Sequence, residues 1–244
     1  MTTPKTDLPE LPEDFQRVLC IVAHPDDLEY GAASAVARWT AAGRSVGYVL
    51  ATRGEAGIDG MDPDECGRVR EAEERASAAV VGVDTVEFLG HHDGVVEAGL
   101  GLRRDLARAI RRHRPDLVVT MHFGLTWPGG FLNQADHRAV GTAVLDAVRD
   151  AGNRWIFPEL GEEGLEPWGG VRQVAVAGTP NPTHAVDVTD WIDAGVASLR
   201  EHKAYLAGLG DGSTDPDAFL RGSARSLAPR FGGRAAVGLE LYGV

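Results

Sequence analysis

The sequence predicts an α/β fold of Rossmann-like architecture, in which a mainly parallel sheet is flanked by helices. Short apolar runs rich in β-branched residues, such as RVLCIVA at 17–23, alternate with longer amphipathic segments, and this order is typical of βαβ units. The chain has 244 residues, of which 43% are hydrophobic, and it is long enough to bury one large core. We therefore expect a single domain over residues 1–244.

The individual elements follow from periodicity and from start and stop signals. Strands are expected at 17–23, 45–51, 85–89 and 116–121, with helices at 28–42, 62–81, 99–113 and 136–150. The start of the helix at 62–81 is the best defined, because Asp62, Pro63 and Glu65 occupy the N-cap, first and third positions of a capping-box variant. Beyond residue 151 we expect strands at 171–177, 185–188 and 236–242 and a helix at 190–206.

Two segments are expected to lie outside this regular pattern. Residues 1–16 are interpreted as a flexible N-terminal extension. The glycine-rich stretch at 208–233 is interpreted as a mobile loop region able to close over a site.

Composition narrows the function. Lys and Arg number 24 against 36 Asp and Glu, so the formal charge of -12 disfavours nucleic-acid binding and favours a small neutral or cationic substrate. The arginine-rich stretch at 103–114 is interpreted as a solvated helix face. No leader-like or membrane-spanning apolar run is present, and Cys20 and Cys66 lack a CxxC partner, so we expect a cytoplasmic protein without membrane contact. The oligomeric state is left open, with a homo-oligomer as one option.

The site is expected where the strand order reverses, because ligands of open α/β sheets bind there beyond the carboxyl ends of the strands. The loops after the strands at 17–23 and 116–121 contain HPDD at 24–27 and the segment 122–137. His24, Asp27 and His137 would form a ligand set of two histidines and one carboxylate. Such a set holds one zinc ion in hydrolases, and iron(II) remains an alternative. Asp26 is the candidate general base, although each motif alone could also be a helix cap.

Two competing motifs are set aside. The string GRSVG at 43–47 matches a nucleophile elbow, but Ser45 lies between a helix end and a strand start, where an elbow does not occur. The first strand is followed by HPDDLEYG instead of GxGxxG, so the Rossmann-like order does not indicate a dinucleotide.

Several motifs, taken in order, are similar to those of a known family. Residues 23–31 read AHPDDLEYG, 52–57 read TRGEAG, 70–73 read REAE and 136–141 read DHRAVG. Over residues 17–206 this order resembles the LmbE-like (PIG-L) N-acetylglucosaminyl deacetylases. The resemblance implies a zinc-dependent hydrolase that removes the acetyl group from an N-acetylglucosamine-type amino-sugar conjugate.

The resemblance also implies roles for single residues. His24, Asp27 and His137 match the zinc ligands, and Asp26 matches the general base. Arg70 matches an arginine that holds substrate, while Asp93, in GHHDG at 90–94, matches a sugar-binding acid. His91 and His92 beside it are further candidates for lining the site.

One position departs from the family pattern. The family usually has His-Pro-Asp-His where this chain has QADH at 134–137. Gln134 can donate a hydrogen bond to an oxyanion but cannot transfer a proton. The leaving-group proton must then come from Asp26 or from another histidine, with His184 the first candidate and His122 the second. Two alternatives remain: an amidase for a larger thiol or sugar conjugate, and a metal- or sugar-binding homologue with little turnover.

Overall fold

The computed structural model describes residues 7–127, 129–210 and 215–244. Its seven-stranded sheet has the order β3-β2-β1-β4-β5-β7-β6. The parallel strands are β1 (Arg17–Val22), β2 (Ser45–Leu50), β3 (Thr85–Phe88), β4 (Leu117–Met121) and β5 (Gln173–Ala177). β7 (Ala236–Gly243) runs antiparallel to both β5 and β6 (His184–Asp187). The predicted α/β fold with a mainly parallel sheet is confirmed.

The strand order reverses at β1. From β1 the chain continues outward to β2 and β3, and it then returns to the other side of β1 with β4. Val18 accordingly pairs with Val46 on one side and with Leu117 on the other. The loops that follow β1 and β4 therefore start side by side at the carboxyl edge of the sheet, as the sequence predicts.

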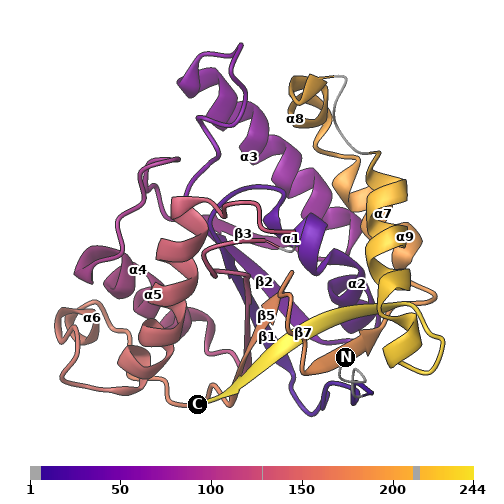
Figure 1. The fold of residues 1–244 in the computed structure, drawn as a ribbon. Helices are drawn as coiled ribbons and strands as arrows, with labels where there is room; N and C mark the ends of the chain where they lie inside the picture. Colours follow the sequence, from indigo (N-terminus) through magenta and orange to yellow (C-terminus); the bar gives the residue numbers. More distant parts are fainter. Residues whose placement is uncertain (1–6, 128, 211–214) are drawn as a thin grey trace.

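Helices cover both faces of the sheet (Figure 1). One face carries α4 (Leu100–His113) and α5 (Ala135–Gly152), with the short α6 (Glu159–Glu162) beside them. The other side carries α1 (Asp27–Gly31), α2 (Ala33–Ala41), α3 (Pro63–Val80), α7 (Ile192–Leu199), α8 (Lys203–Gly208) and α9 (Pro216–Ser226).

The alternation along β1 explains its continuous apolar sequence. Cys20 and Val22 belong to the core under α1, α2 and α7, whereas Leu19 and Ile21 belong to the core under α4 and α5. Successive side chains of a strand point to opposite faces, so a strand covered on both sides needs apolar residues throughout.

Two expected helices are each broken in two. The helix expected at 28–42 is interrupted at Ala32, where φ is -139°, and forms α1 and α2. The helix expected at 190–206 ends at Leu199, and His202 is the N-cap of a separate α8. The break at Ala32 follows Gly31, the last residue of α1, whereas the break before His202 contains neither glycine nor proline and has no local signal in the sequence. The start of α3 is as predicted, with Pro63 at the first position and the Asp62 side chain accepting from the Asp64 N–H at 3.0 Å.

The two irregular segments differ from expectation. Leu8, Leu11 and Phe15 are buried, so the prediction of a flexible extension is wrong for this part of residues 1–16. The expectation of a loop at 208–233 is also wrong for its described part, because 216–226 form α9 and 228–230 form a 3-10 helix. Asp215 caps the start of α9, and the buried Leu220 anchors the helix to the core. The many glycines of this stretch obscure these helix signals in the sequence. Residues 1–6 and 211–214 lie outside the described part.

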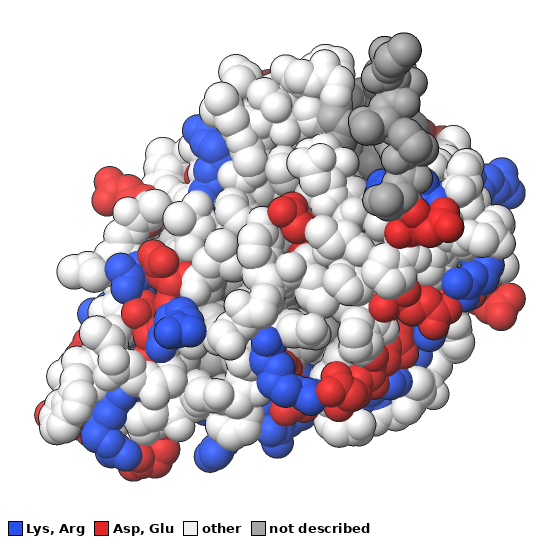
Figure 2. Space-filling model, turned by 60° about the horizontal axis from the view of Figure 1, so that its bottom comes forward, with Lys and Arg blue, Asp and Glu red and all other residues white. Residues whose placement is uncertain are grey.

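The exposed or half-buried arginines of α4 pair with carboxylates, whereas the buried Arg111 donates to the backbone carbonyls of Ala151 and Asn153, so the prediction of a solvated face is wrong for Arg111. Arg103 contacts Asp150 at 2.9 Å, and Arg108 contacts Glu163 at 2.8 Å. Acidic and basic side chains are also mixed on the face shown in Figure 2. Within the described ranges, every helix is too short or too polar to cross a bilayer.

Candidate active site

Three side chains from two loops converge at the carboxyl edge of the sheet. His24 lies just beyond β1, Asp27 begins α1, and His137 lies in the first turn of α5. His24 Nδ1 is 3.2 Å from His137 Nε2, which is 3.0 Å from Asp27 Oδ1. All three residues are buried. The structure thus brings together the three predicted metal ligands.

The second ring nitrogen of each histidine is held by an acceptor. His24 Nε2 lies 3.0 Å from Asp93 Oδ1 and 3.3 Å from Asp136 Oδ2, and His137 Nδ1 lies 2.8 Å from Asn133 Oδ1. We assign protons to these outer nitrogens from this network, because carboxylate and amide oxygens accept hydrogen bonds.

With this assignment, two nitrogen lone pairs and the Asp27 carboxylate face one another. Three acceptors at such short range need a cation or a proton between them. Acceptors behind the outer nitrogens are the usual way in which proteins orient metal-binding histidines. The donor set therefore fits one divalent cation.

The pKa values of His24 and Asp27 are both shifted in a way that bears on cation binding. Burial lowers the pKa of His24, but hydrogen bonds with Asp136 and Asp93 outweigh it and raise the pKa to about 10. Burial raises the pKa of Asp27, but His137 and His24 lower it to about 2. Asp27 is therefore ionised, and a cation that binds here must displace the proton from His24.

Asp136 ties the loop after β3 to the site. Its Oδ2 accepts the Gly94 N–H at 2.7 Å and its Oδ1 accepts the Val96 N–H at 3.1 Å. Because the same carboxylate contacts His24, the loop and the histidine are positioned together.

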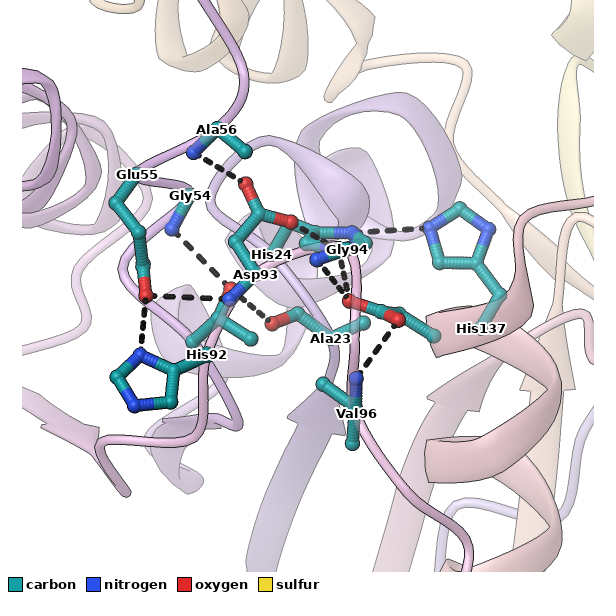
Figure 3. Close-up of polar contacts among 12 residues, drawn as sticks. Ala23, His24, Gly54, Glu55, Ala56, His92, Asp93, Gly94, Val96 and His137 are labelled. Carbon is teal, nitrogen blue, oxygen red and sulfur yellow. Dashed lines mark hydrogen bonds and ion pairs between the residues drawn. The ribbon is translucent and has the colours of Figure 1, made fainter. Parts of the chain in front are cut away.

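Asp93 is committed to contacts within the protein. Its Oδ1 holds His24, while its Oδ2 accepts the Ala56 N–H at 2.9 Å (Figure 3). The Asp93 N–H in turn donates to Glu55 Oε1 at 3.1 Å. Each carboxylate oxygen has two lone pairs, so these contacts leave room for a further donor, and the sugar-binding role of Asp93 stays a prediction.

Asp26 adopts a left-handed backbone conformation, with φ 83° and ψ -19°. This conformation costs a residue other than glycine about 1 kcal/mol. Burial raises the pKa of Asp26 to about 6, opposed by Arg70 and reinforced by Asp27. A carboxylate that titrates near neutrality is suited to general base catalysis.

Arg70 is fastened to the turn that carries Asp26. Its Nη2 donates to the Pro25 carbonyl at 2.6 Å and lies 3.3 Å from Asp26 Oδ2. The guanidinium also lies over the ring of Tyr205, 4.2 Å from its centroid. Arg70 is only 3% exposed, and its ion-pair partner is the candidate base Asp26. The contact of Arg70 with substrate stays a prediction.

His122, the second candidate for the leaving-group proton, lies close to the site. His122 follows β4, and its ring packs on Trp127 with centroids 5.4 Å apart, while Trp127 packs on His137 at 5.7 Å. His122 is therefore near the site, with its Nε2 3.1 Å from the Thr126 carbonyl.

The prediction that His184 supplies the leaving-group proton is wrong. His184 begins β6, four strands from β1, which corresponds to roughly 19 Å. Its Nδ1 lies 3.0 Å from the hydroxyl of Thr183. The reason is topological, because antiparallel β7 inserts between β5 and β6 and moves β6 outward.

Gln134 is exposed at the N-cap of α5, one turn before His137. Its contact with an oxyanion stays a prediction. Sequence reasoning missed Asn133 and Asp136 as supporting residues. The available signal was their position in the sequence, four residues and one residue before His137. Asn133 also contacts His122, because its Nδ2 donates to the His122 carbonyl at 2.9 Å.

Comparison with known proteins decides the family. Residues 19–148 match the family model PIG-L, described as GlcNAc-PI de-N-acetylase. The chain belongs to the PIG-L family. The PIG-L match spans β1 to α5 and so includes the proposed ligands and the base.

Similar PIG-L relatives include deacetylases of amino sugars. A diacetylchitobiose deacetylase of Thermococcus kodakarensis is 29% identical, with 79% of this chain and 71% of that protein covered. A 1D-myo-inositol 2-acetamido-2-deoxy-alpha-D-glucopyranoside deacetylase of Kineococcus radiotolerans is 28% identical, with 78% and 69% covered. The structure of N,N'-diacetylchitobiose deacetylase from Pyrococcus horikoshii is similar with a TM-score of 0.83 and 25% identity, covering 95% of this chain and 85% of that one.

Proposed function

We propose that this PIG-L protein is a zinc-dependent N-deacetylase that removes the acetyl group from an N-acetylglucosamine-type conjugate. The observation that carries the proposal is the convergence of His24 Nδ1, His137 Nε2 and the Asp27 carboxylate next to a buried Asp26. The deacetylase names of the relatives support the same reaction.

In this proposal, His24, Asp27 and His137 hold one divalent ion. Zinc suits two imidazole nitrogens and one carboxylate, and iron(II) is compatible with the same set. A bound ion would supply Lewis-acid polarisation of the amide carbonyl and of the attacking water.

The chain's own residues move the proton. Asp26 accepts a proton from the water at its carboxylate as the oxygen attacks the acetyl carbon. As the C–N bond breaks, Asp26 returns that proton to the amine nitrogen, so the products are acetate and the free amino sugar. This double role is assigned to Asp26 in place of His184, which lies too far away, and of Gln134, which does not transfer protons. His122, which lies near the site, is the second candidate for the leaving-group proton.

The test is acetate release from a panel of N-acetylglucosamine conjugates. Protein stripped of metal should be inactive, and reloading with zinc or iron(II) should restore turnover and rank the two metals. Stoichiometric metal uptake without acetate release from any conjugate would refute the deacetylase and favour a binding protein with little turnover.

A larger conjugate is the second candidate substrate. Leu125, Phe131 and Leu132 are exposed on the loop between β4 and α5, the same loop whose Trp127 packs on His137. Exposed apolar side chains beside a site favour a bulky group on the substrate. Phe131→Ala should then raise KM for conjugates with a large apolar group and leave KM for the simple sugar unchanged.

Three further expectations accompany the proposal. We propose that the whole chain forms one domain and works in a reducing compartment, in keeping with the free, buried Cys20 and Cys66. Homo-oligomerisation remains to be measured by light scattering.

A further inference from the structure

A cluster of buried polar side chains lies next to Asp26 and contacts its backbone. Ser77 Oγ is 2.7 Å from both Glu29 Oε1 and Ser198 Oγ. His202 Nε2 is 3.6 Å from Glu29 Oε2 and from Glu74 Oε2. We call Glu29, Glu74, Ser77, Ser198 and His202 the buried cluster, because each is at most 1% exposed.

Glu74 is the member of the buried cluster that touches the candidate base. Its Oε2 accepts the backbone N–H of Asp26 at 3.2 Å. Asp26 is the residue with the left-handed backbone, so this hydrogen bond acts where the turn is under strain.

Helix α3 contacts both the backbone and the side chain of Asp26. Glu74 binds its backbone, while Arg70, one helical turn earlier, contacts its carboxylate at 3.3 Å. Residues four apart lie on the same helix face, so one rigid element fixes both the backbone and the side chain of Asp26.

We propose that Glu74 is a positioning residue, which holds Asp26 in the left-handed conformation that directs its carboxylate toward the reaction and away from the ligand Asp27. This inference rests on the proposed deacetylase function. Asp27 contacts both site histidines, whereas its neighbour Asp26 contacts Arg70, so the turn at residue 26 separates the two carboxylates.

The chemistry of Glu74 indicates which substitutions should preserve this role. Burial and the neighbouring Glu29 raise the pKa of Glu74 well above its ordinary value, so a neutral acid is expected. A neutral acid still accepts the Asp26 N–H through one oxygen. Glutamine has the same shape and also offers an acceptor oxygen, whereas methionine has similar length and offers none of comparable strength.

The experiment compares Glu74→Met and Glu74→Gln in the metal-loaded enzyme. In Glu74→Met we expect kcat to fall about 10- to 100-fold, because a misplaced catalytic group costs that much, with KM and bound metal unchanged. Glu74→Gln should retain turnover close to that of the wild type. Glu71→Met is the matched control on the same helix, because Glu71 contacts Arg75 at 2.8 Å and lies outside the buried cluster.

A double-mutant cycle separates positioning from a general effect on folding. In an Asp26→Asn background, Glu74→Met should cost little further residual turnover, because the base that it positions is already lost. An equal fractional loss in both backgrounds would overturn the inference. If Glu74→Met does not fold, Glu74→Gln still decides, since an inactive Gln variant with full metal content would contradict an acceptor role.

Other outcomes are equally informative. Loss of metal from Glu74→Gln would show that Glu74 acts as a ligand, and it would overturn the positioning role. A wild-type protein that releases no acetate refutes the proposed function. An active wild type in which Glu74→Met equals Glu71→Met refutes only this inference.

Discussion

His24 Nδ1 and His137 Nε2 face each other at 3.2 Å, although 113 residues separate them in the chain. Each imidazole is held from behind, His24 by Asp93 and Asp136 and His137 by Asn133. The two ring nitrogens are therefore fixed toward one point before any ligand arrives, and such preorganisation is what a metal-dependent hydrolase requires.

Replacement of a ligand and replacement of the base should have different effects. His137→Ala should lose both bound metal and turnover, because it removes one of the three proposed ligands. Asp26→Ala should retain the metal and lose most of its turnover, because Asp26 contacts Arg70 instead of the ligand cluster. Metal content by mass spectrometry and acetate release measure the two effects. Undiminished activity in Asp26→Ala would remove the assignment of the base.

Asp136 should control metal affinity without being a ligand. Asp136→Asn weakens its contacts with His24 and with the N–H groups of Gly94 and Val96. Loss of such a supporting partner typically lowers metal affinity about 10- to 100-fold. Competition with a chelator measures this affinity. Asp146→Asn on the same helix is the control, because Asp146 is half-exposed and contacts Arg103; equal affinities in both variants would argue against the role.

Gly57 should be required for the placement of Arg70. A Cβ at residue 57 would overlap the Arg70 guanidinium, whereas a Cβ at Gly60 in the same loop meets nothing within 4 Å. Gly57→Ala should therefore displace Arg70 and lower kcat/KM about tenfold or more, with Gly60→Ala near the wild type. The kinetic comparison needs matching thermal unfolding curves. Equal kcat/KM in the two variants would show that Arg70 tolerates the displacement.

Glu87 should make the free energy of unfolding depend on pH in the acid range. A hydrogen bond with His113, together with Arg112, lowers the pKa of Glu87 to about 2. The folded pKa is below the unfolded one, so the stabilisation is complete above about pH 5 and is lost as the pH falls from there toward 2. Glu87 is about a quarter exposed, so we expect a contribution of about 1 kcal/mol.

The measurement for Glu87 is urea unfolding of the wild type and of Glu87→Gln at pH 6 and pH 3.5. The wild type should lose more unfolding free energy between these pH values than the variant. Parallel losses would mean that the ion pair between β3 and α4 does not contribute.

The fold was accessible from sequence wherever local patterns were sufficient. The buried strand at 17–22 has an uninterrupted apolar run, and Asp62 with Pro63 marks the start of α3. The break before His202 has no such mark in the sequence, whereas the break at Ala32 follows Gly31. The sequence predicts a flexible extension at residues 1–16, although Leu11 and Phe15 pack into a core formed by segments distant in the chain.

The sequence by itself predicted the proposed ligand set and the edge of the sheet where its members meet. Parallel strands have their carboxyl ends at one edge, so the loops carrying His24 and His137 had to meet there. The tertiary structure alone decided the contacts that distant segments make with the site. Glu74 binds the Asp26 backbone across 48 residues, and His184 is moved outward by β7. Such contacts depend on how separate elements pack, and local spacing in the chain carries no record of them.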